Sequence, residues 1–181
     1  LFMRSSHGEM RGAHASDSSW GWIQIDSLMI GGVEQVSKLK PRDALDETVS
    51  DLPLAQPVQP GQTIEIAFKF TAQLPEVFAR TGYKGDFHMV GQWFPKIGVR
   101  IGAAGLEHWE CAPLSINTEF FADFGTYDVT LTVPSTLVVA ATGVLTAATE
   151  SPGGTRTLTY RAEDVHDFAW TAWSAFHEKS A

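Results

Sequence analysis

The end of the sequence begins like a zinc-binding motif but does not complete it. His177-Glu178 matches the first half of His-Glu-x-x-His, in which two histidines four residues apart share one helix face and bind the same ion. Ala181 occupies the position of the second histidine. Because a zinc site needs three or four converging ligands, we expect no metal site in this chain.

Two further histidines have neighbours that could take part in chemistry. His108 and Cys111 are three residues apart in an expected loop, but no second pair of ligands accompanies them. We interpret them as a loop histidine and a small buried thiol. His166 lies between Asp164 and Asp167, and since adjacent strand residues point to opposite faces of a sheet, we interpret it as a hydrogen-bonded structural histidine.

Acidic and aromatic residues leave two interpretations open. Glu119 to Phe124 could form an acidic, aromatic ligand surface, or a strand edge that anchors its three phenylalanines in the core, which we favour. The six tryptophans could mark a carbohydrate or peptide site, but Trp20 and Trp22 share one face of an expected strand, the usual position of core residues, and we interpret the tryptophans as partly buried core or domain-interface aromatics. The nucleophile elbow Gly-x-Ser-x-Gly, the P-loop and Gly-x-Gly-x-x-Gly are absent, so no complete catalytic site is predicted.

Composition restricts the class of protein. The chain has 181 residues, 44% of them hydrophobic, and a net charge of −8, which disfavours nucleic acid and anionic membrane surfaces as partners. No apolar run approaches the roughly 20 residues of a membrane span. The single cysteine excludes an intramolecular disulfide and leaves the compartment open. The sequence starts at Leu1, which we interpret as a cut or processed end of a longer protein.

Strands are the elements that must position these residues. Residues 62–72 and 127–133 alternate strictly between apolar and polar, which predicts strands with one buried face. Residues 20–30 alternate with a slip near Asp26 to Leu28, which indicates a β-bulge. Apolar residues nowhere recur at helical spacing over three turns. We expect one all-β domain over residues 1–181: a curved, mostly antiparallel two-layer sheet of about nine or ten strands.

Other segments are expected to be irregular. Residues 1–19 are rich in Ser, Gly and His and are expected to be loop or disordered. We interpret residues 74–85 as a short helical turn or loop, and residues 102–113 as a loop.

Three stretches of the sequence resemble one family in the order in which that family has them. They are residues 120–134 with 138–143, the element Gln92-Trp93-Phe94-Pro95-Lys96, and residues 165–170. They resemble the N-terminal β domain of aminopeptidase N-like (membrane alanyl aminopeptidase) zinc metallopeptidases, in particular a bacterial branch. The match covers the latter half of the chain well and the first half only by pattern.

The resemblance implies a saddle-shaped, mostly antiparallel sandwich that packs on a thermolysin-like, zinc-holding domain and helps form the peptide-binding cleft. In the family, zinc activates a water and a glutamate acts as general base. The motifs that carry this chemistry, Gly-x-Met-Glu-Asn and His-Glu-x-x-His, are absent here. The expected partners are a downstream catalytic domain of the same chain, which holds the zinc, and the parent's peptide substrate. No cofactor, nucleic acid or direct membrane insertion is expected for this segment.

The resemblance also suggests site residues. The family grips the free amino group of a peptide with a polar side chain that precedes the aromatic-Pro element. The glutamine of the family has no counterpart at the expected place in this chain. The polar candidates in the window before the aromatic-Pro element are Asp86, His88 and Gln92. We expect Phe168, Trp170 and Trp173 to form an exposed apolar patch that contacts the catalytic domain. The alternatives are a free-standing carbohydrate- or protein-binding sandwich and a structural domain of a parent without peptidase activity.

Overall fold

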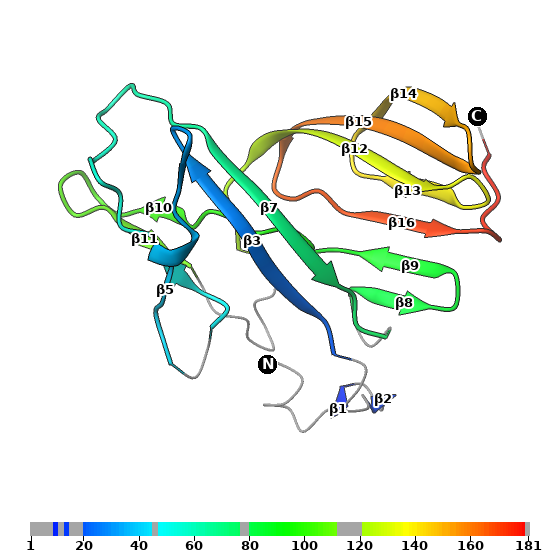
Figure 1. Ribbon diagram of the computed structural model, residues 1–181, viewed down its shortest axis with the longest axis horizontal. Coiled ribbons are helices and arrows are strands. Elements are labelled where there is room, and N and C mark those ends of the chain that lie inside the picture. The colour runs from blue at the N-terminus through cyan, green and yellow to red at the C-terminus, as the bar shows by residue number, and fades with distance from the viewer. Residues whose placement is uncertain are drawn as a thin grey trace.

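The computed structural model describes residues 9–10, 13–14, 20–44, 47–76, 80–111 and 121–179. These residues form sixteen strands and one short 3₁₀ turn. All the strand pairs within the sheets are antiparallel. The all-β, sandwich-like fold expected from the sequence is therefore confirmed (Figure 1). The strand number exceeds nine or ten mainly because five of the sixteen strands are only two residues long, and eleven are longer.

A long antiparallel pair of strands, β3 (Trp22–Ile30) and β7 (Ile66–Gln73), crosses the centre of the molecule (Figure 1). β3 pairs with β7 on one side and with β4 (Val33–Glu34) on the other. The register of β3 shifts between Ile25 and Ser27, which leaves Asp26 without an opposite residue. This bulge lies where the sequence predicted the slip, and it turns Ile25 and Leu28 to the same face of the sheet.

The second sheet contains the strands that alternate most regularly. β15 (Thr155–Val165) lies between β12 (Gly125–Pro134) and β14 (Val144–Ser151). Leu131, Leu158 and Tyr160 are between 4% and 7% exposed, whereas Thr130 and Thr132 on the opposite face are exposed. The period-two pattern therefore separates a buried from a solvated face, as the sequence predicted.

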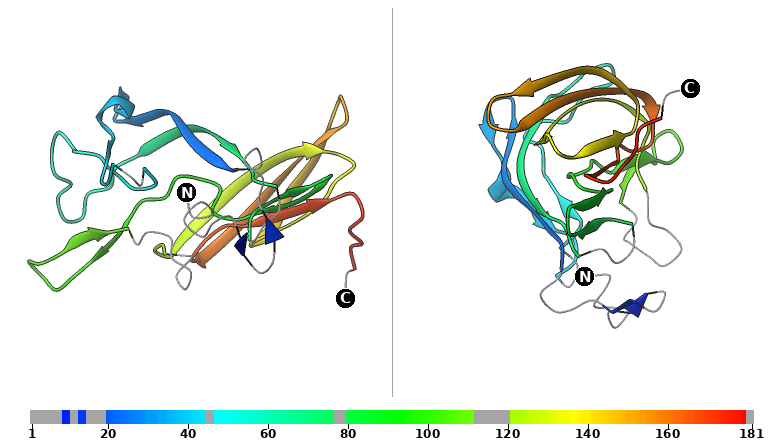
Figure 2. Two further views of the ribbon diagram at one scale, coloured as in Figure 1. Left: turned by 90° about the horizontal axis from the view of Figure 1, so that it is seen from below. Right: turned by 90° about the vertical axis from the view of Figure 1, so that its right-hand side faces the viewer.

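The third sheet lies against the second, which produces two layers (Figure 2). Its order is β13 (Val138–Ala141), β16 (Trp170–Trp173), β9 (Phe87–Val90) and β8 (Gly82–Lys84). Ala172 and Val90 are 0% and 2% exposed and face the second sheet. Strand β16 is the last strand in the sequence but lies in the middle of this sheet. It therefore pairs with β13 and β9, which are distant from each other in the sequence.

The remaining elements are short. β10 (Val99–Ile101) pairs with β11 (His108–Glu110), β5 (Lys40–Pro41) with β6 (Ser50–Asp51), and β1 (Glu9–Met10) with β2 (Ala13–His14). The 3₁₀ turn η1 (Val36–Lys38) follows β4.

Aromatic contacts connect the sheets through the core. The ring of Phe70 on β7 lies 6.3 Å from Trp93, and Trp93 lies 5.3 Å from Phe94, centroid to centroid. Phe94 contacts Tyr127 on β12 at 6.0 Å, and Tyr127 contacts Phe168 at 6.2 Å. Phe168 is 0% exposed. The Gln92–Lys96 segment thus connects the β3–β7 sheet to the core between the other two sheets.

Several local expectations are wrong. Residues 82–84 form strand β8 rather than a helical turn or loop, and residues 108–110 form strand β11 inside the expected loop. Both are three-residue strands that a neighbouring strand stabilises by pairing, which periodicity over so few residues does not reveal. β7 starts at Ile66 instead of residue 62, because its partner β3 ends at Ile30 opposite Ile66. Of residues 1–19, expected to be loop, the structure describes only β1 and β2.

Candidate functional site: an apolar sheet face and its polar neighbours

Asp86 lies in the turn between β8 and β9 and ties that turn to the end of β16. Its carboxylate accepts hydrogen bonds from the Trp173 indole N–H at 3.0 Å and the Ser174 backbone N–H at 3.3 Å. Hydrogen bonds from Ser174, with that from Trp173, hold the pKa of Asp86 below its ordinary value. The carboxylate suggested to grip a substrate amine is therefore ionised but already engaged in a structural contact.

His88 also has structural partners. Its Nδ1 lies 2.9 Å from the backbone oxygen of Asp86, and its ring stacks on Tyr83 at 6.5 Å between centroids. On strand β9 it points to the same side as Val90, which is buried in the core. His88 and Asp86 therefore belong to one structured turn.

Gln92 belongs to a different cluster, which we call the polar clamp: Gln92, Lys96 and Asp167. Gln92 has a left-handed backbone (φ 52°), and its side-chain amide donates to Asp167 Oδ2 at 2.7 Å. Lys96 Nζ lies 2.8 Å from the same oxygen, and the side chains of Lys96 and Asp167 are each 16% exposed. Asp167 Oδ1 accepts the Phe168 backbone N–H at 2.8 Å. The clamp holds the Gln92–Lys96 segment against the residues that precede β16.

The sequence assigned Phe168 to an exposed interface, and this is wrong. Phe168 is 0% exposed, with Tyr127 and Tyr160 at 6.2 and 6.3 Å, and the Trp93 indole N–H donates to its backbone oxygen at 3.0 Å. Trp170 is half-buried and packs against the same core. Trp173 is 37% exposed. The three expected interface residues therefore divide between the core and the surface.

Trp173 belongs to the side of the third sheet that faces away from the core, which we call the outer face. Its side chains follow from the strand registers, because residues opposite each other share a face. The outer face contains Phe87, Met89, Val138, Ala140, Thr171 and Trp173, with Lys84 at its edge. Met89 is 41% exposed. One charged residue among seven side chains makes this an unusually apolar surface for a chain of net charge −8.

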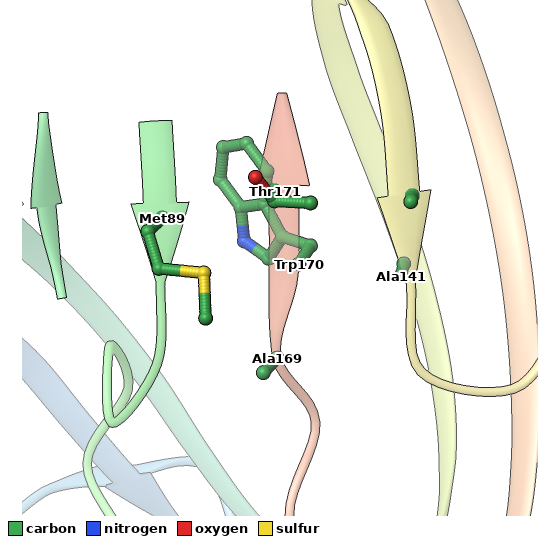
Figure 3. A pocket seen from close by; sticks show the side chains of 6 residues that line it. Met89, Ala141, Ala169, Trp170 and Thr171 are labelled. Atoms are coloured by element: carbon green, nitrogen blue, oxygen red, sulfur yellow. The ribbon is translucent and has the colours of Figure 1, made fainter. Parts of the chain in front are cut away.

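A hollow of about 260 Å³ lies at one end of the outer face. Figure 3 shows Met89 from β9 and Thr171 and Trp170 from β16 around it, with Ala141 on β13. The indole N–H of Trp170 is buried and has no hydrogen-bond partner among the described residues. The other polar side-chain group of the lining, the Thr171 hydroxyl, donates to the His88 backbone oxygen at 2.7 Å. The hollow therefore suits an apolar side chain.

Three aromatic rings cover the other end of the outer face. Phe87 lies 5.9 Å from Trp173 and 6.2 Å from Phe176, and Trp173 lies 5.6 Å from Phe176, all edge to face. Such pairs fix ring orientation and contribute about 0.5–1.5 kcal/mol each beyond burial. Phe176, which follows β16, thus packs on this face.

A second surface, which we call the trough, lies under the β3–β7 sheet and has a volume of about 2250 Å³. Trp22 and Trp109 line it and are 50% and 56% exposed. Trp22 is therefore not a core residue, because no layer of the described residues covers its face of β3, and an interface position for it stays a prediction.

The remaining candidates have structural partners or are exposed. His166 Nε2 accepts the Ala122 backbone N–H at 3.2 Å, which confirms the structural interpretation. His108 lies 3.7 Å from Glu110, and Cys111 is a free, half-buried thiol. Glu119 and Phe120 lie outside the described residues. Phe124 is 67% exposed and so does not anchor a strand edge in the core.

Lys96 and Asp167 are the residues of the polar clamp that sequence reasoning did not assign. The signal for Lys96 was the Trp-aromatic-Pro-Lys element, but the pairing with Asp167 joins positions 71 residues apart and needed the fold.

In the part of the chain that the structure describes, no group of three or more His, Cys, Asp or Glu side chains is arranged to hold a metal ion. Nor do the described residues contain a helix long and apolar enough to cross a membrane. Comparison of the chain with family models, with curated proteins and with solved structures finds no match.

Proposed function

We propose that this chain is a non-catalytic β domain that docks through its outer face onto a thermolysin-like zinc peptidase domain of the same polypeptide. In this role it resembles the N-terminal domain of aminopeptidase N-like proteins and helps form their peptide-binding cleft. The chain alone has no peptidase activity, and the zinc belongs to the catalytic domain.

The outer face is the observation that carries the proposal. A sheet normally buries one face and solvates the other, yet the outer face places Met89, Trp173 and Val138 where polar side chains would stand. An exposed apolar surface of this kind marks a contact with another protein surface. Phe176 packs onto the same face, so residues 174–179 lead away from β16 beside it.

Two of the three family-like stretches also have structural roles that suit a supporting domain. The Gln92–Lys96 element forms the polar clamp, and residues 165–170 supply Asp167 and Phe168 to the clamp and the core. Their residue types are thus explained by fold construction, without a catalytic role. Asp86, His88 and Gln92 each have an intramolecular partner, so a substrate contact by any of them would require that partner to be exchanged.

A second candidate is a free-standing binding module, and the trough favours it. Exposed Trp22 and Trp109 line a concave surface, as in sites for carbohydrate or protein ligands. Under this alternative the isolated chain binds a ligand without any further domain.

The coding sequence downstream of Ala181 tests the proposal. We expect it to encode Gly-x-Met-Glu-Asn and His-Glu-x-x-His, and the complete product to release N-terminal residues from alanine p-nitroanilide in a zinc-dependent manner. Downstream sequence without the zinc motif would indicate a structural domain of an inactive parent. A reading frame that stops near Ala181 would contradict docking in cis and favour the binding module.

Docking itself is tested by two matched substitutions in the complete protein. Met89→Lys places a charge in the outer face, whereas Val144→Lys places one on β14, where Val144 is 70% exposed and outside that face. We expect Met89→Lys alone to lower peptidase activity and to loosen the domain contact, measured as faster proteolysis between the domains. Equal behaviour of the two variants would contradict docking through the outer face.

A further inference from the structure

The trough has features that point to a polypeptide ligand. We propose that it binds an extended, largely apolar segment of a partner protein, which adds as a strand to the free edge of β7 and its N-terminal extension. This site lies on a different surface from the outer face, and it does not rest on the proposed peptidase-supporting function.

The size and lining of the trough favour a long, apolar ligand over a small polar one. Its volume of about 2250 Å³ exceeds the roughly 300–1,000 Å³ of typical small-molecule sites. Eight large hydrophobic side chains that line it are at least 37% exposed: Trp22, Ile23, Leu54, Val58, Ile64, Ile97, Trp109 and Phe121. A ligand that covers them must be long and apolar.

The charged side chains of the trough are balanced, which favours a ligand without net charge. Four basic and four acidic side chains line it: Arg42, Arg80, Lys96, Arg100, Glu47, Asp51, Glu65 and Glu110. Several of them pair within the protein, as Arg42 does with Asp51 at 2.6 Å and Lys96 does with Asp167 at 2.8 Å. A balanced lining offers no field that would concentrate nucleic acid or another polyanion.

The free edge of β7 identifies the ligand as a polypeptide. β7 pairs with β3 along one edge, and no described strand pairs with its other edge. Such an edge presents unpaired backbone N–H and C=O groups. Extended peptides bind exposed edges by completing these hydrogen bonds, while alternate side chains enter the adjoining pocket. Ile66 and Phe68 of β7 line the trough and so define the side on which those side chains would lie.

The residues before β7 supply an independent observation. Thr63, Ile64 and Glu65 continue the strict alternation of β7, but they form no ladder, since β3 ends opposite Ile66. Ile64 is 39% exposed and lines the trough. A segment with the pattern of a strand and no partner strand among the described residues is suited to receive one, and an incoming strand would cover Ile64.

The probe is a phage-displayed library of random nine-residue peptides, selected on the complete 181-residue chain. We expect enriched sequences to be largely apolar, with large apolar residues at alternate positions, and to bind as synthetic fluorescein-labelled peptides in fluorescence anisotropy. N-methylation of alternate backbone amides in a selected peptide should weaken binding about tenfold or more, because the ladder cannot form. Ile64→Ser in the protein should weaken it comparably, and Val144→Ser, a control at a more exposed position on β14, should leave it unchanged.

Thermal unfolding of both variants separates lost binding from lost fold, since neither side chain is buried. Failure to enrich any sequence, or equal affinity of the N-methylated peptide, would overturn the proposal. Concentration-dependent dimerisation that Ile64→Ser abolishes would also overturn it, because a second copy of the chain would then occupy the trough.

Discussion

Gln92 combines a strained backbone with a favourable side-chain contact. A non-glycine residue with φ near 52° costs on the order of 1 kcal/mol, and a hydrogen bond to a partly buried carboxylate contributes about 1.5–3 kcal/mol. The contact with Asp167 therefore outweighs the strain. The side-chain contact thus offsets the cost of a left-handed backbone that glycine would adopt freely.

We predict that Gln92→Ala lowers the free energy of unfolding by about 1.5–3 kcal/mol, because it removes the hydrogen bond and keeps the strain. Gln92→Gly should lower it by about 1 kcal/mol less, because glycine adopts the left-handed conformation freely. Urea unfolding of the two variants measures both values. A glycine variant as unstable as the alanine variant would show that the backbone at residue 92 is not strained.

Glu34 is a residue whose charge matters for the β3–β4 hairpin. Its carboxylate accepts hydrogen bonds from Ser27 Oγ and from the backbone N–H groups of Leu28, Val36 and Gln35. These bonds, that from Ser27 foremost, lower the pKa of Glu34 from 4.5 to about 2. The ionised form is thus favoured by the fold.

The stability that Glu34 contributes should be complete above its unfolded pKa of 4.5 and lost as the pH falls toward the folded pKa of about 2. We predict that Glu34→Gln reduces stability at pH 7 and flattens the fall in stability between these two pH values. Urea unfolding at pH 7, 4.5 and 3 compares the variant with the parent chain. An unchanged pH dependence would contradict the assigned hydrogen bonds.

The exposed fractions of individual side chains were the least predictable property at the residue scale. Phe168 and Trp22 are both aromatic residues near strands, and the sequence assigned Phe168 to the surface and Trp22 to the core or a domain interface. The structure buries Phe168 and leaves Trp22 exposed, at 0% and 50%. Whether a strand face is covered depends on elements distant in sequence, and alternation reports only that a strand has two different faces.

At the scale of elements, long alternating strands were predictable and short pairings were not. β12, β15 and the bulge of β3 follow from local pattern, because many residues repeat the same signal. β8 and β11 have three residues each and depend on pairing with β9 and β10. The start of β7 likewise depends on where its partner ends.

The turn between β13 and β14 provides a test at this scale. Gly143 has φ 89°, and a Cβ atom there would overlap the backbone oxygen of Arg161 on β15. Gly153, in the turn between β14 and β15, has a similar φ of 97° but open space around a Cβ. Replacing either glycine would therefore strain the backbone, and only at Gly143 would the new Cβ atom also collide with another residue.

We predict that Gly153→Ala destabilises the chain by about 1 kcal/mol and that Gly143→Ala destabilises it by roughly 2–4 kcal/mol. The difference arises because β14 must move away from β15 to admit the methyl group. Thermal unfolding of the two variants checks the order. If both variants lost the same stability, the close approach of Gly143 to Arg161 would be contradicted.

At the scale of the whole molecule, the third sheet has one face in the core and an outer face that the proposed docking would cover. We predict that Phe168→Ala costs about 3–5 kcal/mol of unfolding free energy, since the side chain lies wholly in the core. Met89→Ala, on the outer face, should cost about 1 kcal/mol or less in the isolated chain. Calorimetry of the two variants measures this contrast, and a large loss for Met89→Ala would place that face in the core.

The most direct test of docking is hydroxyl-radical footprinting of Met89 and Trp173 in residues 1–181 and in the complete protein. Both side chains are exposed here, at 41% and 37%, and sulfur and indole groups oxidise readily. We predict that their oxidation slows several-fold in the complete protein, whereas Trp109 in the trough, 56% exposed, keeps its rate. Unchanged rates at Met89 and Trp173 would contradict docking through the outer face.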